Sequence, residues 1–183
     1  VFIADEVQTG FGRTGSKMWG IEHYGVDPDI MTMAKGIANG LPIAGTLATA
    51  AVADSWKAGN ISTYGGNPIS TAAANAVFDT IQEEKLLENC EKMGKLLREG
   101  LEGLKKKYPK TIGDVRGKGL MQALELVKDE TAKDRTPAPE AANRLFEETK
   151  KRGLLIGKGG LYFNVIRISP ALNIGKAEIE HAV

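Results

Sequence analysis

The sequence predicts an α/β fold, and three observations support that class. Short apolar segments with the character of strands alternate along the chain with segments whose apolar residues recur at helical spacing. The 22 glycines gather in short clusters between these segments, where they allow sharp turns or a close approach to a ligand. The composition, 183 residues with 42% hydrophobic and 26% charged, is that of a globular protein large enough to bury a core.

The first part of the chain contains three predicted strands. Val1–Val7 is the first, Asp29–Ala34 is the second, and a third is expected within Ile43–Ala50. The chain begins without methionine, inside the first of these strands, and residues 177–183 have the pattern of an unfinished helix. We therefore expect the chain to be a piece of a longer protein.

Two helices follow these strands. Asn67 and Pro68 predict the start of the first, with asparagine as the N-cap and proline at the first helical position, and we expect it to run through Ile81. The second, longer helix carries one apolar stripe, formed by Leu86, Cys90, Met93, Leu97, Leu101, Leu104 and Tyr108. The composition changes near residue 85, so we predict one domain over residues 1–85 and another over residues 86–183.

The second domain is expected to contain short strands with a helix between them. The predicted strands are Leu120–Val127, Leu154–Ile156 and Val165–Ser169, and the predicted helix lies near Pro139–Arg152. Such an alternation is typical of α/β units.

Charge and cysteine content narrow the function classes. The chain has 24 basic and 23 acidic residues, and a net charge of +1 argues against a nucleic-acid or membrane-surface binder. No apolar run reaches the roughly 18 residues of a membrane span. A single cysteine excludes an internal disulfide and a cysteine-based zinc site, and the two histidines lack ligand spacing, so no metal site is expected. One cysteine also suits a reducing compartment.

Two segments of the chain resemble phosphate-binding motifs. Gly10–Gly15 matches the G-x-G-x-x-G pattern of dinucleotide-binding folds and follows a predicted strand. However, no convincing helix opens after it, and Asp5 and Glu6 at the strand end would repel a pyrophosphate. The strand also resembles the metal-binding strand of P-loop enzymes, but the G-x-x-x-x-G-K-[ST] motif is absent from the chain.

A third pattern is more specific, because it requires an acid and an amine at the ends of two strands. Asp5 lies near the end of the first predicted strand, and the second predicted strand ends next to Lys35. Parallel neighbours in an open sheet place their carboxyl ends side by side, where ligands bind. There an amine can form a Schiff base with an aldehyde cofactor, while a carboxylate keeps a pyridine nitrogen of that cofactor protonated. Taken singly, each residue has a plainer interpretation as a solvated or satisfied strand-end charge.

Five segments resemble the class III aminotransferases, which are fold-type I enzymes dependent on pyridoxal 5'-phosphate. The segments are VFIADEVQTGFGRTG, PDIMTMAKGIANGLPIAG, STYGGNP, GDVRGKGLM and IRISPAL, in family order and at family spacing. The resemblance implies that residues 1–85 are part of the large, mainly parallel-sheet domain, and residues 86–183 are an incomplete small C-terminal domain. It also implies that the family's first half, with its phosphate-cradling serine–glycine loop and an aromatic residue stacked on the cofactor ring, is absent.

The resemblance assigns roles to residues of the first domain. Lys35 resembles the lysine that forms the Schiff base and then moves a proton between the substrate Cα and the cofactor C4′. Asp5 resembles the partner of the pyridine nitrogen, and Val7 the apolar residue packed on one face of the ring. Gln8 resembles the group that hydrogen-bonds the ring's 3′ oxygen.

Two further roles concern the cofactor phosphate and the substrate. Thr63 is similar to the threonine that reaches the phosphate of the neighbouring subunit's cofactor, so the resemblance implies a homodimer with active sites at the subunit interface. Arg167 resembles the arginine that grips the substrate α-carboxylate in a two-pronged pair. Its plainer interpretation is an edge-strand arginine facing water.

The expected function is transfer of an amino group from an amino acid, alanine or an ω-amino acid, to a 2-oxo acid such as glyoxylate, pyruvate or 2-oxoglutarate. We expect the chain alone to bind the cofactor weakly and to turn over little. The alternatives are a non-catalytic association module of the same fold and an NAD-binding domain. A cytoplasmic location is expected, with the mitochondrial matrix as the alternative.

Overall fold

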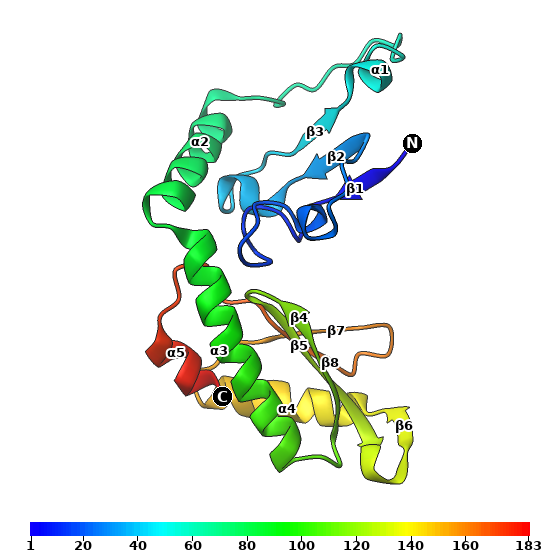
Figure 1. Ribbon diagram of the computed structural model, residues 1–183, viewed down its shortest axis with the longest axis vertical. Coiled ribbons are helices and arrows are strands. Elements are labelled where there is room, and N and C mark those ends of the chain that lie inside the picture. The colour runs from blue at the N-terminus through cyan, green and yellow to red at the C-terminus, as the bar shows by residue number, and fades with distance from the viewer. The chain divides into compact units, whose positions relative to one another are not determined.

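The computed structural model describes residues 1–183, which divide into two compact units, Val1–Glu88 and Asn89–Val183 (Figure 1). The division falls inside the long helix α3 (Leu86–Lys107), close to the change of composition near residue 85. No helix of the chain combines the length and the apolar character that crossing a membrane requires.

A three-stranded sheet in the order β1-β2-β3 forms the centre of the first unit. Strands β1 (Ile3–Asp5) and β2 (Ile30–Met33) are parallel, and β3 (Gly45–Ala48) is antiparallel to β2. The first strand is shorter than the predicted Val1–Val7 because the chain turns after Asp5. The backbone N–H of Val7 donates to Asp5 Oδ1 at 3.2 Å, which bends the chain out of the sheet.

The other regular elements of this unit are helical. They are the 3₁₀ turns η1 (Gly20–Tyr24) and η2 (Lys35–Ala38), the short α1 (Ala50–Ala53) and the long α2 (Pro68–Glu83). The predicted cap of α2 is confirmed, since Asn67 Oδ1 accepts the backbone N–H of Ser70 at 3.0 Å. Helix α2 packs against η2, and Phe78 meets the ring of Phe11 edge-on with 5.6 Å between centroids.

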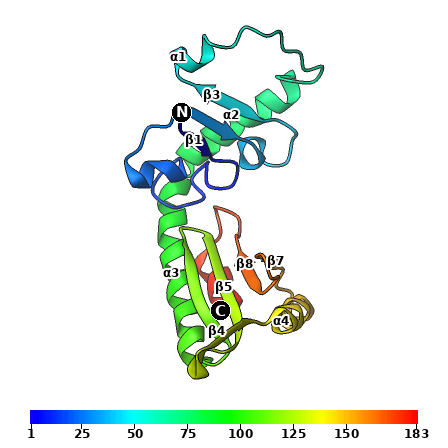
Figure 2. The same cartoon turned by 90° about the vertical axis from the view of Figure 1, so that its right-hand side faces the viewer.

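The second unit contains an antiparallel sheet in the order β4-β5-β8-β7, with β6 also paired to β5. Its remaining elements are the rest of α3, the 3₁₀ turn η3, and helices α4 and α5. The bounds are β4 (Ile112–Lys118), β5 (Met121–Asp129), η3 (Glu130–Ala132), β6 (Asp134–Pro137), α4 (Pro139–Lys151), β7 (Gly157–Gly159), β8 (Val165–Ile168) and α5 (Lys176–Ala182). Figure 2 shows β4 and β5 side by side as the arms of one hairpin.

Two expectations for this unit were wrong. The apolar segment Leu154–Ile156 is not a strand, and β7 is instead the glycine-rich Gly157–Gly159 that follows it. The strand Ile112–Lys118 was missed because two glycines and three charged residues dilute its apolar alternation. All neighbouring strands of this sheet are antiparallel, so its helices are not crossovers between parallel strands.

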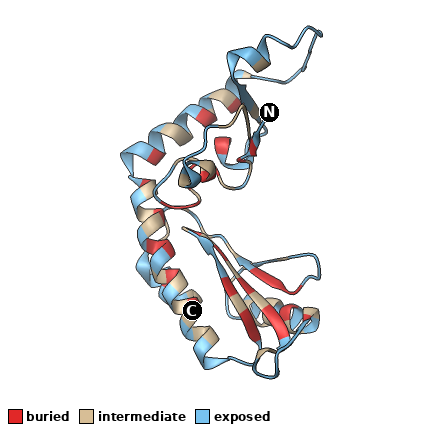
Figure 3. Cartoon of the chain, turned by 45° about the vertical axis from the view of Figure 1, so that its right-hand side comes forward, coloured by how far each residue is buried: buried red, intermediate tan, exposed pale blue.

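The core of the second unit joins α3, α4 and α5 to the sheet (Figure 3). Cys90, Leu97 and Leu101 of the predicted apolar stripe are buried in it. Tyr108 is the exception, because α3 ends at Lys107 and the tyrosine ring lies half exposed beyond it. Burial of each leucine of this size contributes about 1.5–3 kcal/mol relative to exposure, so α3 is fixed mainly by its stripe.

Glu148 near the end of α4 makes the stability of the second unit depend on pH. Hydrogen bonds from Lys151 (2.8 Å) and Arg152 (2.7 Å) lower the pKa of Glu148 from 4.5 to about 2. A lowered carboxylate pKa stabilises the fold above the unfolded value and loses that effect as pH falls through the folded value. The melting temperature of Glu148→Gln should therefore lie below wild type at pH 6, and the difference should shrink between pH 4.5 and about 2.

The neighbouring Glu147 makes no ion pair or hydrogen bond and supplies the control. Thermal unfolding followed at a series of pH values should show little effect of Glu147→Gln. A Glu148→Gln difference that is the same at pH 6 and pH 3 would contradict this account.

Candidate active site

Strands β1 and β2 lie side by side in the sheet (Figure 1). Their parallel register brings Asp5 and Lys35 to the same edge of the first sheet. The two strands are parallel neighbours, as predicted, with Ile3 opposite Ile30 and Asp5 opposite Thr32. Lys35 starts η2 directly after β2. This edge is where ligands bind in open sheets of parallel strands.

Asp5 is held through one of its two carboxylate oxygens. Thr32 Oγ1 donates to Asp5 Oδ1 at 3.0 Å, and the Val7 backbone N–H donates to the same oxygen at 3.2 Å. Oδ2 accepts no hydrogen bond, and the side chain is exposed. The carboxylate is thus oriented by its own chain and keeps one oxygen for a donor from outside.

Lys35 has an unusual backbone conformation for its residue type. Its φ is +48°, in the left-handed region that side chains with a Cβ rarely adopt. The side chain is exposed, and its amine makes no ion pair or hydrogen bond with the chain. Ala34, in extended conformation, precedes it, and the turn of η2 begins at Lys35 itself. The fold therefore maintains a disfavoured backbone at the amine on which the proposed chemistry depends.

This conformation predicts the relative stability of two substitutions at residue 35. Lys35→Gly should be more stable than Lys35→Ala by about 1 kcal/mol, because glycine adopts positive φ without steric cost. Lys17 is an exposed lysine without a positive φ, and there the order should reverse. Chemical denaturation of the four variants measures both differences. Equal stability of Lys35→Gly and Lys35→Ala would contradict the argument.

Val7 and Gln8 follow Asp5 at the start of the glycine-rich loop. Val7 is half-buried and Gln8 is exposed, so an apolar side chain and an amide stand next to the carboxylate. Glu6, between Asp5 and Val7 in the sequence, is buried. Its carboxylate accepts hydrogen bonds from backbone N–H groups on the far side of the loop. Sequence reasoning treated Glu6 only as a charge that repels phosphate. The signal available was a carboxylate in an apolar, glycine-rich stretch, where burial requires many donors.

The dinucleotide-binding alternative for Gly10–Gly15 does not fit the structure. These residues form turns, and the first helical element after them is the short 3₁₀ turn η1 rather than an α-helix. The N–H groups of Gly20 and Ile21 at its start already bind the carboxylate of Glu6. Phe11 of this segment packs edge-on against Trp19, with 5.0 Å between ring centroids. The loop is packed on itself and offers no helix N-terminus to a pyrophosphate.

Thr63 belongs to the segment between α1 and α2. Its side chain is exposed, and no hydrogen bond or ion pair links it to Asp5 or Lys35. Its role at the cofactor phosphate stays a prediction.

Arg167 belongs to the second unit, in β8 between Ala123 of β5 and Gly157 of β7. Ile166 and Ile168 on either side pack into the core, and the side chain of Arg167 is exposed on the other face, as alternation predicts. It makes no ion pair. A Cβ at Gly159 would lie 3.2 Å from Arg167 Cδ, so the glycines of β7 leave space for the arginine stem.

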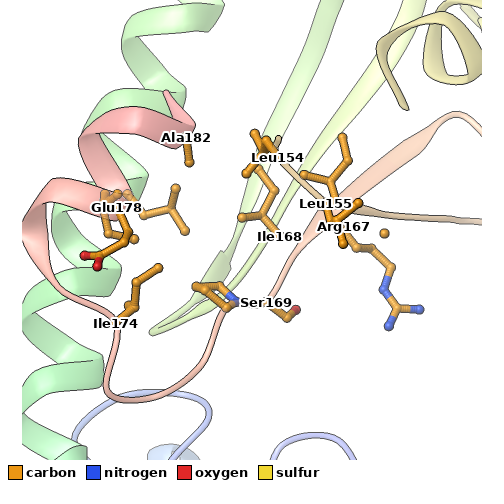
Figure 4. Close-up of a pocket in the computed structure, with 13 residues that line it drawn as sticks. Leu154, Leu155, Arg167, Ile168, Ser169, Ile174, Glu178 and Ala182 are labelled. Carbon is orange, nitrogen blue, oxygen red and sulfur yellow. The ribbon is translucent and has the colours of Figure 1, made fainter. Parts of the chain in front are cut away.

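An apolar cavity of about 300 Å³ lies behind this strand, between α3, α5 and β8. Figure 4 shows that the guanidinium of Arg167 points away from Glu178 and Ile174 across this cavity. Arg167 borders the cavity with its neighbours Ile168 and Ser169.

Comparison with known proteins gives one consistent result. The family model described as "Aminotransferase class-III" matches residues 1–183. The chain is 46% identical to the mitochondrial alanine–glyoxylate aminotransferase 2 homolog 2 of Arabidopsis thaliana, with 100% of this chain and 38% of the relative covered. It is 44% identical to a taurine–pyruvate aminotransferase of Bilophila wadsworthia, with 100% and 42% covered.

Solved structures agree with the sequence comparison. A transaminase from the marine bacterium Virgibacillus superposes with a TM-score of 0.90 at 33% identity, covering 100% of this chain and 43% of the other. The chain thus spans about two fifths of the length of the relatives it matches. Its α/β architecture is that of a stretch of the fold-type I transferases, and the chain belongs to the class III aminotransferase family.

Proposed function

We propose that the longest natural protein containing this chain is an aminotransferase that moves an amino group from an amino acid to a 2-oxo acid. The observation that carries the proposal is the juxtaposition of Asp5 and Lys35 at the carboxyl ends of parallel neighbours, in a chain of this family. Class III aminotransferases depend on pyridoxal 5'-phosphate. When bound, that cofactor supplies an aldehyde that condenses with amines and a ring that withdraws electrons from the substrate Cα.

The residues at the sheet edge fit this cofactor. Asp5 Oδ2, which no group of the chain occupies, would accept the N–H of the pyridine ring, and the exposed amine of Lys35 would carry the aldehyde carbon. Val7 would pack on one face of the ring, and Gln8 would donate to its 3′ oxygen. Thr63, whose side chain is exposed, would reach the phosphate of a cofactor held by a second copy.

The proton transfer falls to Lys35. With substrate and cofactor bound, the amine of Lys35 would act as the base that moves a proton between the substrate Cα and C4′ of the cofactor. Asp5 would stabilise the positive charge on the pyridine nitrogen throughout. Both residues project from adjacent strand ends of a small sheet, and Thr32 and the Val7 backbone restrict the motion of the carboxylate.

Arg167 would bind the α-carboxylate of the substrate. Loss of one partner of such a charged pair costs about 2–5 kcal/mol, so kcat/KM of Arg167→Ala should fall by about 30-fold or more. KM should rise more than kcat falls, because the contact exists before the chemical step. Arg144 is exposed in the same unit without an ion pair, and Arg144→Ala should behave like wild type. An unchanged KM for Arg167→Ala would remove this assignment.

The substrates are proposed as a class. The names of the relatives include alanine–glyoxylate and taurine–pyruvate pairs, so α-amino and ω-amino donors should both be assayed. The experiment follows formation of the new amino acid from glyoxylate, pyruvate or 2-oxoglutarate with each donor, after addition of pyridoxal 5'-phosphate. A wild-type protein that incorporates the cofactor and transfers no amino group from any donor would contradict the proposal.

A homodimer and a cytoplasmic location belong to the same proposal, with the mitochondrial matrix, named for the Arabidopsis relative, as the alternative. Because the chain spans about two fifths of its relatives, we expect the isolated chain to turn over little. Equal turnover by the isolated chain and the longer protein would contradict that expectation.

The second candidate function is a non-catalytic association module. Exposed apolar side chains such as Val1, Ile61 and Tyr64 favour it.

A further inference from the structure

Glu6 is a buried carboxylate without an opposite charge. Only 2% of its surface is exposed, and it makes no ion pair. Its oxygens accept three hydrogen bonds: from the backbone N–H of Gly20 at 2.8 Å, from that of Ile21 at 2.7 Å and from Thr9 Oγ1 at 2.5 Å. A carboxylate is costly to bury, and charge-assisted hydrogen bonds of this kind offset the cost.

The backbone of Glu6 is fixed as well. Its N–H donates to the carbonyl oxygen of Thr32 at 2.9 Å, and its carbonyl oxygen accepts the N–H of Gly10 at 2.9 Å. The approach of Gly20 depends on its missing side chain, since a Cβ there would lie 2.7 Å from Thr9 Cβ. Hydrogen bonds therefore connect Glu6 to β2, to Gly10 in the loop and to the start of η1.

These ties act on the residues that flank Glu6 in the sequence. Asp5 precedes it, and Val7 and Gln8 follow it, and all three are proposed to touch the cofactor ring. An apolar side chain here would leave the N–H groups of Gly20 and Ile21 without an acceptor, so the carboxylate holds the start of η1 against residues 5–8. The carboxylate therefore helps to define the backbone conformation of residues 5–8.

We propose that Glu6 is a positioning residue for the cofactor site. By binding Gly20, Ile21 and Thr9, it fixes the direction in which Asp5, Val7 and Gln8 leave the end of β1. The inference rests on the proposed function, because it requires that pyridoxal 5'-phosphate bind at this edge.

The test uses the Glu6→Gln variant of the longest natural protein that contains the chain. The amide keeps the shape of the side chain but turns a donor toward Gly20 or Ile21, so one N–H loses its acceptor. We expect the Kd for pyridoxal 5'-phosphate to rise at least about tenfold, the scale of one lost hydrogen bond to a charge. The visible circular dichroism of the bound cofactor should change, because it reports the asymmetric surroundings of the ring.

A matched control separates positioning from stability. Thr14 is buried in the same loop, where its Oγ1 lies 3.1 Å from His23 Nε2, and it contacts none of residues 5–8 through a hydrogen bond. Thr14→Val should lower the melting temperature while the cofactor Kd and circular dichroism stay at wild-type values. If Glu6→Gln does not fold, Thr9→Val decides, since it removes one of the three hydrogen bonds to the carboxylate and should also raise the Kd by about tenfold.

The outcomes distinguish the two proposals. A wild-type protein that binds no pyridoxal 5'-phosphate overturns the proposed function and this inference with it. Wild-type binding with an unchanged Kd and circular dichroism in Glu6→Gln, or in Thr9→Val where that variant decides, overturns the positioning role alone. A lowered melting temperature without a spectral change in the deciding variant has the same meaning, because it assigns Glu6 to the fold only.

Discussion

Lys35→Ala should lower the rate of amino transfer by about four powers of ten, the upper range for removal of a general acid–base group. The variant loses the amine that is proposed to carry the aldehyde carbon and to move the proton from Cα to C4′. Because Lys35 is exposed and makes no ion pair or hydrogen bond, its truncation breaks no contact of the fold. The measurement is single-turnover amino transfer by the wild-type and variant proteins at saturating cofactor.

Lys17→Ala is the matched control, since Lys17 is also exposed and without a partner in the neighbouring loop. It should retain the wild-type rate. The same pair of variants discriminates the association module, because self-association measured by sedimentation should be unaffected by Lys35→Ala. Amino transfer by Lys35→Ala within about tenfold of wild type would contradict the role of the lysine as the general base.

Asp5→Asn should lower kcat by about 10- to 10³-fold, because an opposite charge next to a pyridinium shifts its pKa by about 1–3 units and each unit is a factor of ten. The amide can still accept the hydrogen bonds of Thr32 and Val7 through its oxygen, so the local structure is retained. The pyridine nitrogen then loses its proton more readily, and the ring withdraws electrons from Cα less strongly. The effect should appear in kcat, with the melting temperature close to wild type.

Asp27→Asn gives the comparison, because Asp27 is exposed and accepts no hydrogen bond. Its kcat should equal that of wild type. A similar small loss in both variants would mean that Asp5 is an ordinary strand-end carboxylate.

Much of the fold could be predicted from local signals. Asn67 capped the helix that Pro68 starts, and the apolar stripe of α3 became the core of the second unit. The parallel pairing of β1 and β2 followed from an apolar run that ends in an acid and another that ends next to an amine. The cap and the stripe are set by residues close in sequence, and each strand end is marked by its own short apolar run, so these signals can be read without the fold.

Other features depended on contacts distant in sequence. Strand β7 is glycine-rich and has no strand signal of its own, but it pairs with β8, where its glycines accommodate Arg167. The left-handed backbone of Lys35 has no signature in the residue type. Glu6 could not be assigned because its donors, Gly20 and Ile21, become neighbours only when the loop closes.

The central claim is that Lys35 carries the aldehyde carbon of pyridoxal 5'-phosphate. The most direct test uses the longest natural protein that contains this chain. The protein is incubated with the cofactor and reduced with borohydride, and the labelled residue is found by peptide mapping. The account predicts one pyridoxyl group per chain, on Lys35, and none at this site in Lys35→Ala. A folded protein with Lys35 unlabelled would contradict it and would favour the non-catalytic module.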